Sequence, residues 1–250
     1  MLFPFRDENP TRRPPVLTVA IIGINVVVFL YQMTLPGRTG EAFVYAFGMI
    51  PAVLFGTAQL PPELAVLPPW ATVFTSMFVH GGVMHIAGNM LFLWVFGNNI
   101  EDSMGHGRFI VFYLLCGIAA AMAQGLSDPS SDIPMIGASG AISGVLGAYL
   151  VLHPRAHVDS LLFLGIFAQV IRLPAMVVLG LWFGLQLLNA LLVHGQGEGG
   201  VAFLAHIGGF VAGMVLVPLF REKDIPLLGG PARQRRFEYR RRPNQRGPWG

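Results

Sequence analysis

The chain has 250 residues, of which 54% are hydrophobic and only 12% are charged. Soluble globular proteins carry roughly 25% charged residues, so this composition excludes a disordered protein, a nucleic-acid-binding tail protein and an ordinary soluble enzyme. A single cysteine, Cys116, excludes a disulfide framework and a cysteine-rich metal site. The length suits about six membrane-spanning helices of ~20 residues each, joined by loops.

Six apolar stretches are long enough to cross a bilayer, and they predict an all-α membrane protein with a six-helix bundle. They cover residues 16–34, 82–103, 109–126, 134–152, 173–193 and 201–220. A seventh apolar stretch, residues 161–171, is too short to span, so we expect an interfacial or re-entrant segment there. Charged residues precede the first stretch and no small-residue cleavage site follows it, which predicts an uncleaved anchor.

The distribution of Lys and Arg predicts the orientation. If the N-terminus is cytoplasmic, the cytoplasmic segments contain 15 of the 16 Lys and Arg residues, and the outer segments contain only Arg38. By the positive-inside rule, both termini are then cytoplasmic.

The same map divides the chain into segments. We expect a cytoplasmic segment over residues 1–15, a six-span domain over 16–220 and a basic, flexible cytoplasmic tail over 221–250. The tail is expected to fix the topology and to contact anionic lipid, whereas nucleic acid is not an expected partner. Residues 35–81 form an outer loop that is too long for a plain connector, so we expect it to lie against the membrane surface.

Polar side chains inside the predicted spans are few, and they are costly unless they face the bundle interior or water. His85 and Asn89 lie near the start of the second stretch, Ser139 near the start of the fourth, and His206 near the start of the sixth. In the predicted orientation these three spans all run from outside to inside. The four side chains therefore lie at a similar depth of ~5–12 Å below the outer end, which indicates one site.

Ser139 lies in a glycine-rich segment, residues 137–140. Two pairs of glycines have the four-residue spacing that lets helices pack closely: Gly140 with Gly144, and Gly209 with Gly213. Close packing is one interpretation of these glycines, but it would also bring Ser139 beside His206. Because an imidazole within ~3 Å can accept a serine proton, the pair predicts a Ser–His dyad. The Gly-x-Ser-x-Gly pattern of α/β-hydrolases is absent, and no Asp or Glu near the outer ends completes a triad.

His85 and Asn89 are four residues apart and share one helix face. They could donate to an oxyanion together with the backbone N–H of Ser139, or they could form an interhelical hydrogen-bond pair. His80 is expected to fix the adjoining loop. We expect no metal or cofactor, because the sequence lacks His-Glu-x-x-His and other ligand spacings. Glu101 and Asp102 are expected to pair with Arg108 or another inner arginine.

Three segments resemble motifs of the rhomboid family of intramembrane serine proteases, in order and on the expected spans: residues 80–89, residues 137–140, and residues 205–209 with Gly213. Glu101 and the pair Gly107–Arg108 also resemble family positions. The resemblance implies a six-helix bundle, a catalytic dyad of Ser139 and His206, and an oxyanion site made by His85, Asn89 and the Ser139 amide. The supporting positions that it implies are Gly137, Gly140, Ser143 and Gly209, without any cofactor.

The resemblance also implies a function. It implies cleavage of single-span membrane proteins near the outer face, at small residues, most typically in a prokaryotic cytoplasmic (inner) membrane. Some family members have an aromatic residue beneath the histidine ring, one turn after the nucleophile. This chain has Ser143 there, and its hydroxyl either orients His206 or has no role.

Two alternatives belong to other functional classes. A catalytically inactive rhomboid-like protein that binds membrane proteins is expected to lack Ser139 or His206, and both are present. A transporter or channel is expected to carry ionisable residues at mid-membrane, or broken helices in matching halves.

Overall fold

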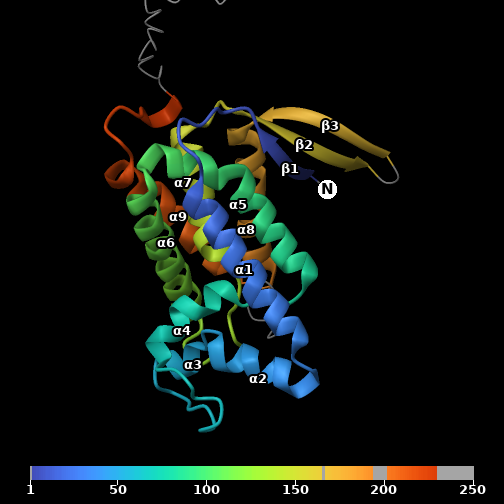
Figure 1. The fold of residues 1–250 in the computed structure, drawn as a ribbon, viewed down its shortest axis with the longest axis vertical. Coiled ribbons are helices and arrows are strands. Elements are labelled where there is room, and N and C mark those ends of the chain that lie inside the picture. Colours follow the sequence, from blue (N-terminus) through green and yellow to red (C-terminus); the bar gives the residue numbers. More distant parts are fainter. Residues whose placement is uncertain (1, 165–166, 194–201, 230–250) are drawn as a thin grey trace, which may run out of the picture.

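A computed structural model describes residues 2–164, 167–193 and 202–229 (Figure 1). Long helices form a bundle, with a small β-sheet at one end and short helices at the other (Figure 1). The helices are α1 (Val16–Thr34), α2 (Gly37–Phe47), α3 (Pro51–Leu54), α4 (Pro69–Thr75), α5 (Val83–Met104), α6 (His106–Ser127), α7 (Ser139–Leu152), α8 (Ala175–Val193) and α9 (Phe203–Phe220), with 3₁₀ turns at Ser76–Phe78 and Leu227–Gly229.

Four of the described helices are long and apolar enough to cross a membrane: α1, α6, α8 and α9. A fifth candidate is α5 taken together with Pro69–Phe78, from which it is bent by 82°. These helices match five of the six predicted stretches to within a few residues, although Val201 lies outside the described residues. The structure thus supports four to five candidate spans, and it places α2–α4 within residues 35–81.

Helix α7 is shorter than the predicted stretch over residues 134–152. The chain before Ser139 is not helical, because Met135 forms a β-bridge with Met49 and Gly137 has a φ angle of +114°. A φ angle in this region is strained for residues with a side chain, so glycine is the suitable residue at this turn. The helix therefore begins at the serine itself.

The prediction of an all-α protein is wrong at the end of the bundle that carries the β-sheet. Strands β1 (Leu2–Asp7), β2 (His157–Leu164) and β3 (Phe167–Pro174) form an antiparallel sheet in the order β1-β2-β3. The described residues of the stretch 161–171, predicted as a non-spanning interfacial or re-entrant segment, belong to the hairpin strands β2 and β3. A two-stranded hairpin is marginal by itself, and β1 adds the third strand from a distant part of the sequence.

Helix α7 occupies the centre of the bundle. Every residue from 140 to 149 is buried, and the helix contacts α5, α6, α8 and α9. Its contact with α9 is made by glycines: a Cβ atom on Gly209 would collide with the carbonyl oxygen of Gly140, and one on Gly213 with that of Gly144. The two backbones can approach this closely only because these side chains are absent.

Two acidic residues at the end of α5 fix the start of α1. The carboxylate of Glu101, which is 1% exposed, accepts hydrogen bonds from the backbone N–H groups of Leu17 (2.8 Å) and Thr18 (2.7 Å). A carboxylate is favourable at a helix N-terminus, where N–H groups lack helical partners. Asp102 pairs with Arg12 at 3.3 Å, which agrees with the expected inner arginine, whereas Glu101 pairs with His106 at 2.5 Å.

Candidate active site

The beginnings of three helices meet on the side of the bundle where α2–α4 lie (Figure 1). Ser139 is the first residue of α7, His206 lies in the first turn of α9, and His85 and Asn89 lie in the first two turns of α5. The structure therefore brings together all four residues that the sequence places at a common depth.

Ser139 and His206 are in hydrogen-bond contact. The Oγ atom of Ser139 lies 2.8 Å from Nε2 of His206, whose residue is 8% exposed. The other ring nitrogen, Nδ1, lies 2.9 Å from Oε1 of Gln186 on α8. An amide oxygen can only accept, so Nδ1 carries the proton and Nε2 presents its lone pair to the serine hydroxyl. This tautomer is the one that can accept the Ser139 proton.

Sequence reasoning did not identify Gln186 as a site residue. A glutamine inside a predicted span is a signal of an interior-facing group, but hydropathy does not tell which neighbour it reaches. One turn earlier on α8, the ring centroid of Trp182 lies 5.9 Å from that of His206. The aromatic contact with the histidine is thus made from α8. Ser143 does not bond to His206, because its hydroxyl donates to the carbonyl oxygen of Ser139 at 2.6 Å.

His85 and Asn89 lie against the chain just before Ser139. A Cβ atom at Gly137 would lie 2.7 Å from Nε2 of His85 and 3.6 Å from Nδ2 of Asn89. The N–H of Gly81 donates to Nδ1 of His85 at 3.3 Å, so Nε2 carries the proton and is a donor. Gly137 therefore leaves room for two side-chain donors next to the serine.

Asn89 carries a donor that the described part of the protein does not satisfy. Its Nδ2 atom is buried and has no hydrogen-bond partner among the described residues. Leaving such a group unpaired is unfavourable by roughly 1–3 kcal/mol, and an unpaired group in a native structure needs an explanation. An acceptor that is present only when a ligand is bound, such as a developing oxyanion, provides one.

His80 is held in place by α1. Gln32 donates from Nε2 to the His80 carbonyl at 2.7 Å and accepts from the His80 N–H at 3.3 Å. These bonds, which use the backbone of His80, hold the loop before α5 against α1. Within residues 2–164, 167–193 and 202–229, no group of three or more His, Cys, Asp or Glu side chains could hold a metal ion.

The fold and the site define a helical membrane protein with a serine and a histidine paired between its central helices. A Rhomboid domain model matches residues 68–223, which is more than half of the chain. The protein therefore belongs to the rhomboid family, as its motifs predict, and it is an integral membrane protein.

Several known proteins are similar to this chain. It is 29% identical over 199 residues to the rhomboid protease GluP of Bacillus subtilis, a match that covers 80% of this chain but only 34% of GluP. It is 26% identical over 220 residues to the rhomboid protease AarA of Providencia stuartii, covering 80% of this chain and 70% of AarA. It is 30% identical over 154 residues to the mitochondrial rhomboid protein 1 of Saccharomyces cerevisiae, covering 56% of this chain and 43% of that protein.

Proposed function

We propose that the protein is an intramembrane serine endopeptidase that hydrolyses peptide bonds in or near the membrane segments of single-span proteins. The observation that carries the proposal is the 2.8 Å contact between Ser139 Oγ and His206 Nε2 inside a bundle of apolar helices. The family assignment supports it, because relatives such as GluP and AarA are named proteases.

The proposed reaction begins when Ser139 Oγ attacks the carbonyl carbon of the substrate peptide bond. The hydroxyl proton passes to Nε2 of His206, and the carbonyl electron pair moves onto oxygen. Asn89 Nδ2, His85 Nε2 and the backbone N–H of Ser139 are the donors proposed to stabilise that oxyanion. When the C–N bond breaks, His206 returns the proton to the leaving amine. Water then repeats the sequence on the acyl-enzyme and releases Ser139.

Gln186 has a supporting part in this scheme as a positioning residue. Its Oε1 atom accepts the Nδ1 proton of His206, which favours the tautomer with a free lone pair on Nε2. It also limits rotation of the ring away from Ser139. The role needs no negative charge, and among the described residues no carboxylate bonds to this histidine.

We further propose that α7 completes a set of six membrane crossings and that both termini are cytoplasmic, in a prokaryotic inner membrane. The basis is the charge bias, because this orientation leaves only Arg38 of 16 Lys and Arg residues on the outer side. The beginnings of α5, α7 and α9 then lie near the outer face, where water can reach Ser139.

Reconstitution in liposomes with a single-span test substrate tests the proposal. Wild type should cleave the substrate, and Ser139→Ala and His206→Ala should each abolish cleavage while the protein remains folded. Ser127→Ala, which removes an exposed hydroxyl at the end of α6, is a matched control and should retain activity. Binding of the substrate without cleavage by wild type would favour the inactive rhomboid-like protein instead.

A further inference from the structure

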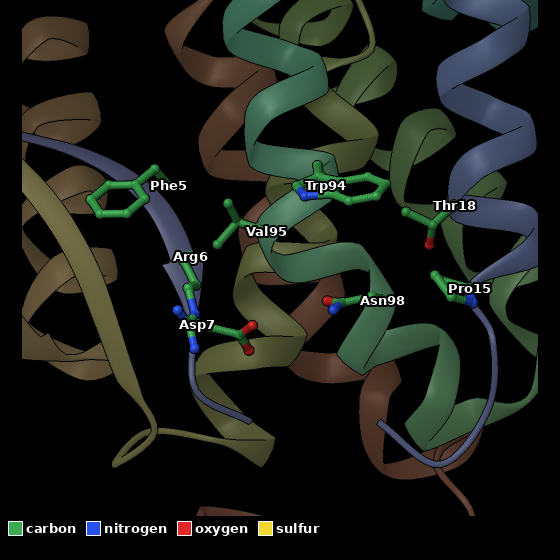
Figure 2. Close-up of a pocket in the computed structure, with 8 residues that line it drawn as sticks. All are labelled: Phe5, Arg6, Asp7, Pro15, Thr18, Trp94, Val95 and Asn98. Atoms are coloured by element: carbon green, nitrogen blue, oxygen red, sulfur yellow. The ribbon is translucent and has the colours of Figure 1, made fainter. Parts of the chain in front are cut away.

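A pocket of about 210 Å³ lies at the end of the bundle that carries the β-sheet, and the proposed reaction does not use it (Figure 2). It is bounded by β1, by the start of α1 and by α5, and its lining includes Arg6, Asp7, Pro15, Thr18, Trp94 and Asn98. Asp7 connects this region to the last turns of α7 through a 2.7 Å hydrogen bond from Tyr149. Tyr149 is ten residues after Ser139, so the pocket is ~15 Å from the serine along α7.

The pocket lies beside exposed apolar side chains of two candidate membrane spans. Trp94 is 57% exposed, and Val19, on α1 beside Thr18, is 49% exposed. Exposed apolar side chains on these helices face lipid, because α1 and α5 are candidate spans. Glu101 and Asp102 mark the polar layer at the end of α5, and Trp94 precedes them by ~10 Å along the helix. Tryptophan is enriched at this level of a membrane protein, where headgroups meet acyl chains.

Two side-chain donors beside the pocket have no acceptor among the described residues. Arg6 is exposed, and although its backbone pairs with Asp159 in the sheet, its guanidinium forms no ion pair or hydrogen bond with the described residues. Three arginines at this end, Arg12, Arg13 and Arg172, are paired with carboxylates, whereas Arg155, like Arg6, forms no ion pair among the described residues. Asn98 uses Oδ1 to accept from the backbone and side chain of Asn99, at 2.8 and 3.0 Å, and its Nδ2 has no acceptor among the described residues.

The one acidic residue of the lining is already occupied. Figure 2 shows Asp7 and Asn98 pointing toward one another from β1 and α5. Oδ2 of Asp7 accepts from Asn99 Nδ2 at 2.6 Å and from the Tyr149 hydroxyl at 2.7 Å. Asp7 is the nearest acidic group to Arg6 in the lining, but among the described residues the two side chains do not form an ion pair, so the Arg6 guanidinium has no counter-ion in direct contact.

We propose that this pocket binds the phosphodiester group of a glycerophospholipid from the adjacent leaflet. Arg6 forms the ion pair with the phosphate, which a guanidinium can contact through two parallel N–H groups. Asn98 Nδ2 and the indole N–H of Trp94 supply further donors. The acyl chains lie along the exposed apolar surfaces of α1 and α5. Basic pockets between helices at a membrane surface are suited to lipid headgroups.

A bound lipid would stabilise the sheet end of the bundle, because it contacts β1, α1 and α5 together. Ligands that bind only the folded state raise its stability in proportion to the logarithm of their concentration. The proposal is independent of the proposed protease activity, and its test needs no substrate.

The test uses the full chain, delipidated in detergent and titrated with phosphatidylglycerol, with bound lipid counted by native mass spectrometry and stability followed by thermal unfolding. Wild type should retain one lipid and unfold at a higher temperature with it. Arg6→Gln should bind at least ten-fold more weakly. Arg155→Gln is the matched control, because Arg155 is exposed at the same end of the bundle but does not line the pocket.

A second variant keeps the test decisive if Arg6→Gln disturbs the folding of β1. Asn98→Asp keeps an acceptor for Asn99 but places a negative charge in the pocket, so it should also abolish lipid retention. Diacylglycerol with the same acyl chains, which lacks the phosphodiester, should not bind. Retention by Arg6→Gln and Asn98→Asp equal to wild type would overturn the proposal. Displacement of the lipid by glycerol 3-phosphate at equal concentration would overturn the assignment of a lipid as the ligand.

Discussion

Gly213 sets how closely α9 approaches α7, so its replacement by alanine should separate the two helices. A Cβ atom at this position would lie 2.7 Å from the Cα atom of Gly144 and closer still to its carbonyl oxygen. Non-bonded carbon atoms prefer ~3.5–4.0 Å, so α9 must move away by about 1 Å. His206 lies about two turns earlier on the same helix, and the movement would draw its Nε2 atom away from Ser139 Oγ, now at 2.8 Å.

The expected loss is mainly in rate. A 1 Å displacement of a reacting group lowers the rate on the order of 100-fold, whereas overpacking a core destabilises by about 1–3 kcal/mol. Gly213→Ala should therefore reduce kcat on a single-span substrate about 100-fold and lower the free energy of unfolding by no more than that range. The assays are cleavage in liposomes and denaturant unfolding in detergent.

Gly23→Ala is the matched control, because a Cβ atom at Gly23 on α1 would have no atom within 4 Å. It should leave both the rate and the stability unchanged. Turnover by Gly213→Ala at the wild-type rate would refute the inference that the glycine contact between α7 and α9 positions the dyad.

Three further predictions concern single residues. In steady-state kinetics, Gln186→Leu should lower kcat about tenfold with KM unchanged, since one hydrogen bond is worth up to about 1.5 kcal/mol. Gln186→Glu keeps an acceptor for the histidine and should retain activity. Asn89→Leu should lower kcat by ~10²–10³, and full turnover at saturating substrate would make Asn89 a packing residue. Burial lowers the pKa of His153 to about 4, so the folded state binds this proton less readily than the unfolded chain. Unfolding experiments across pH should show stability falling as pH decreases from about 6.5 toward 4, and His153→Asn should lose this component.

The sequence was sufficient to predict the elements whose signal is local. Helix α1 begins and ends where the apolar stretch does, because hydropathy alone decides which residues lie in lipid. The proximity of Ser139 and His206 was also predictable, since glycine spacing and common depth are both properties of the sequence.

Features that depend on distant partners were not predictable in the same way. Strand β1 pairs with β2 more than 150 residues later, and no short-range pattern specifies that pairing. Gln186 and Trp182 reach His206 only because of how α8 is rotated against α9, which the nearly uniform apolar surface of α8 does not reveal. The hydrogen bonds of Glu101 to the start of α1 likewise depend on tertiary contact. Its acidic neighbour Asp102 pairs with an inner arginine, Arg12, as expected.

Covalent labelling of Ser139 tests the central claim most directly, because it reports the reactivity of the nucleophile without any choice of substrate. The protein in detergent would be treated with an alkyl fluorophosphonate, and the modified residue located by peptide mass spectrometry. The proposed dyad predicts modification of Ser139 in wild type and loss of that modification in a folded His206→Ala variant, because the hydroxyl then has no base. Absence of label on wild-type Ser139, or equal labelling in His206→Ala, would contradict the proposed mechanism.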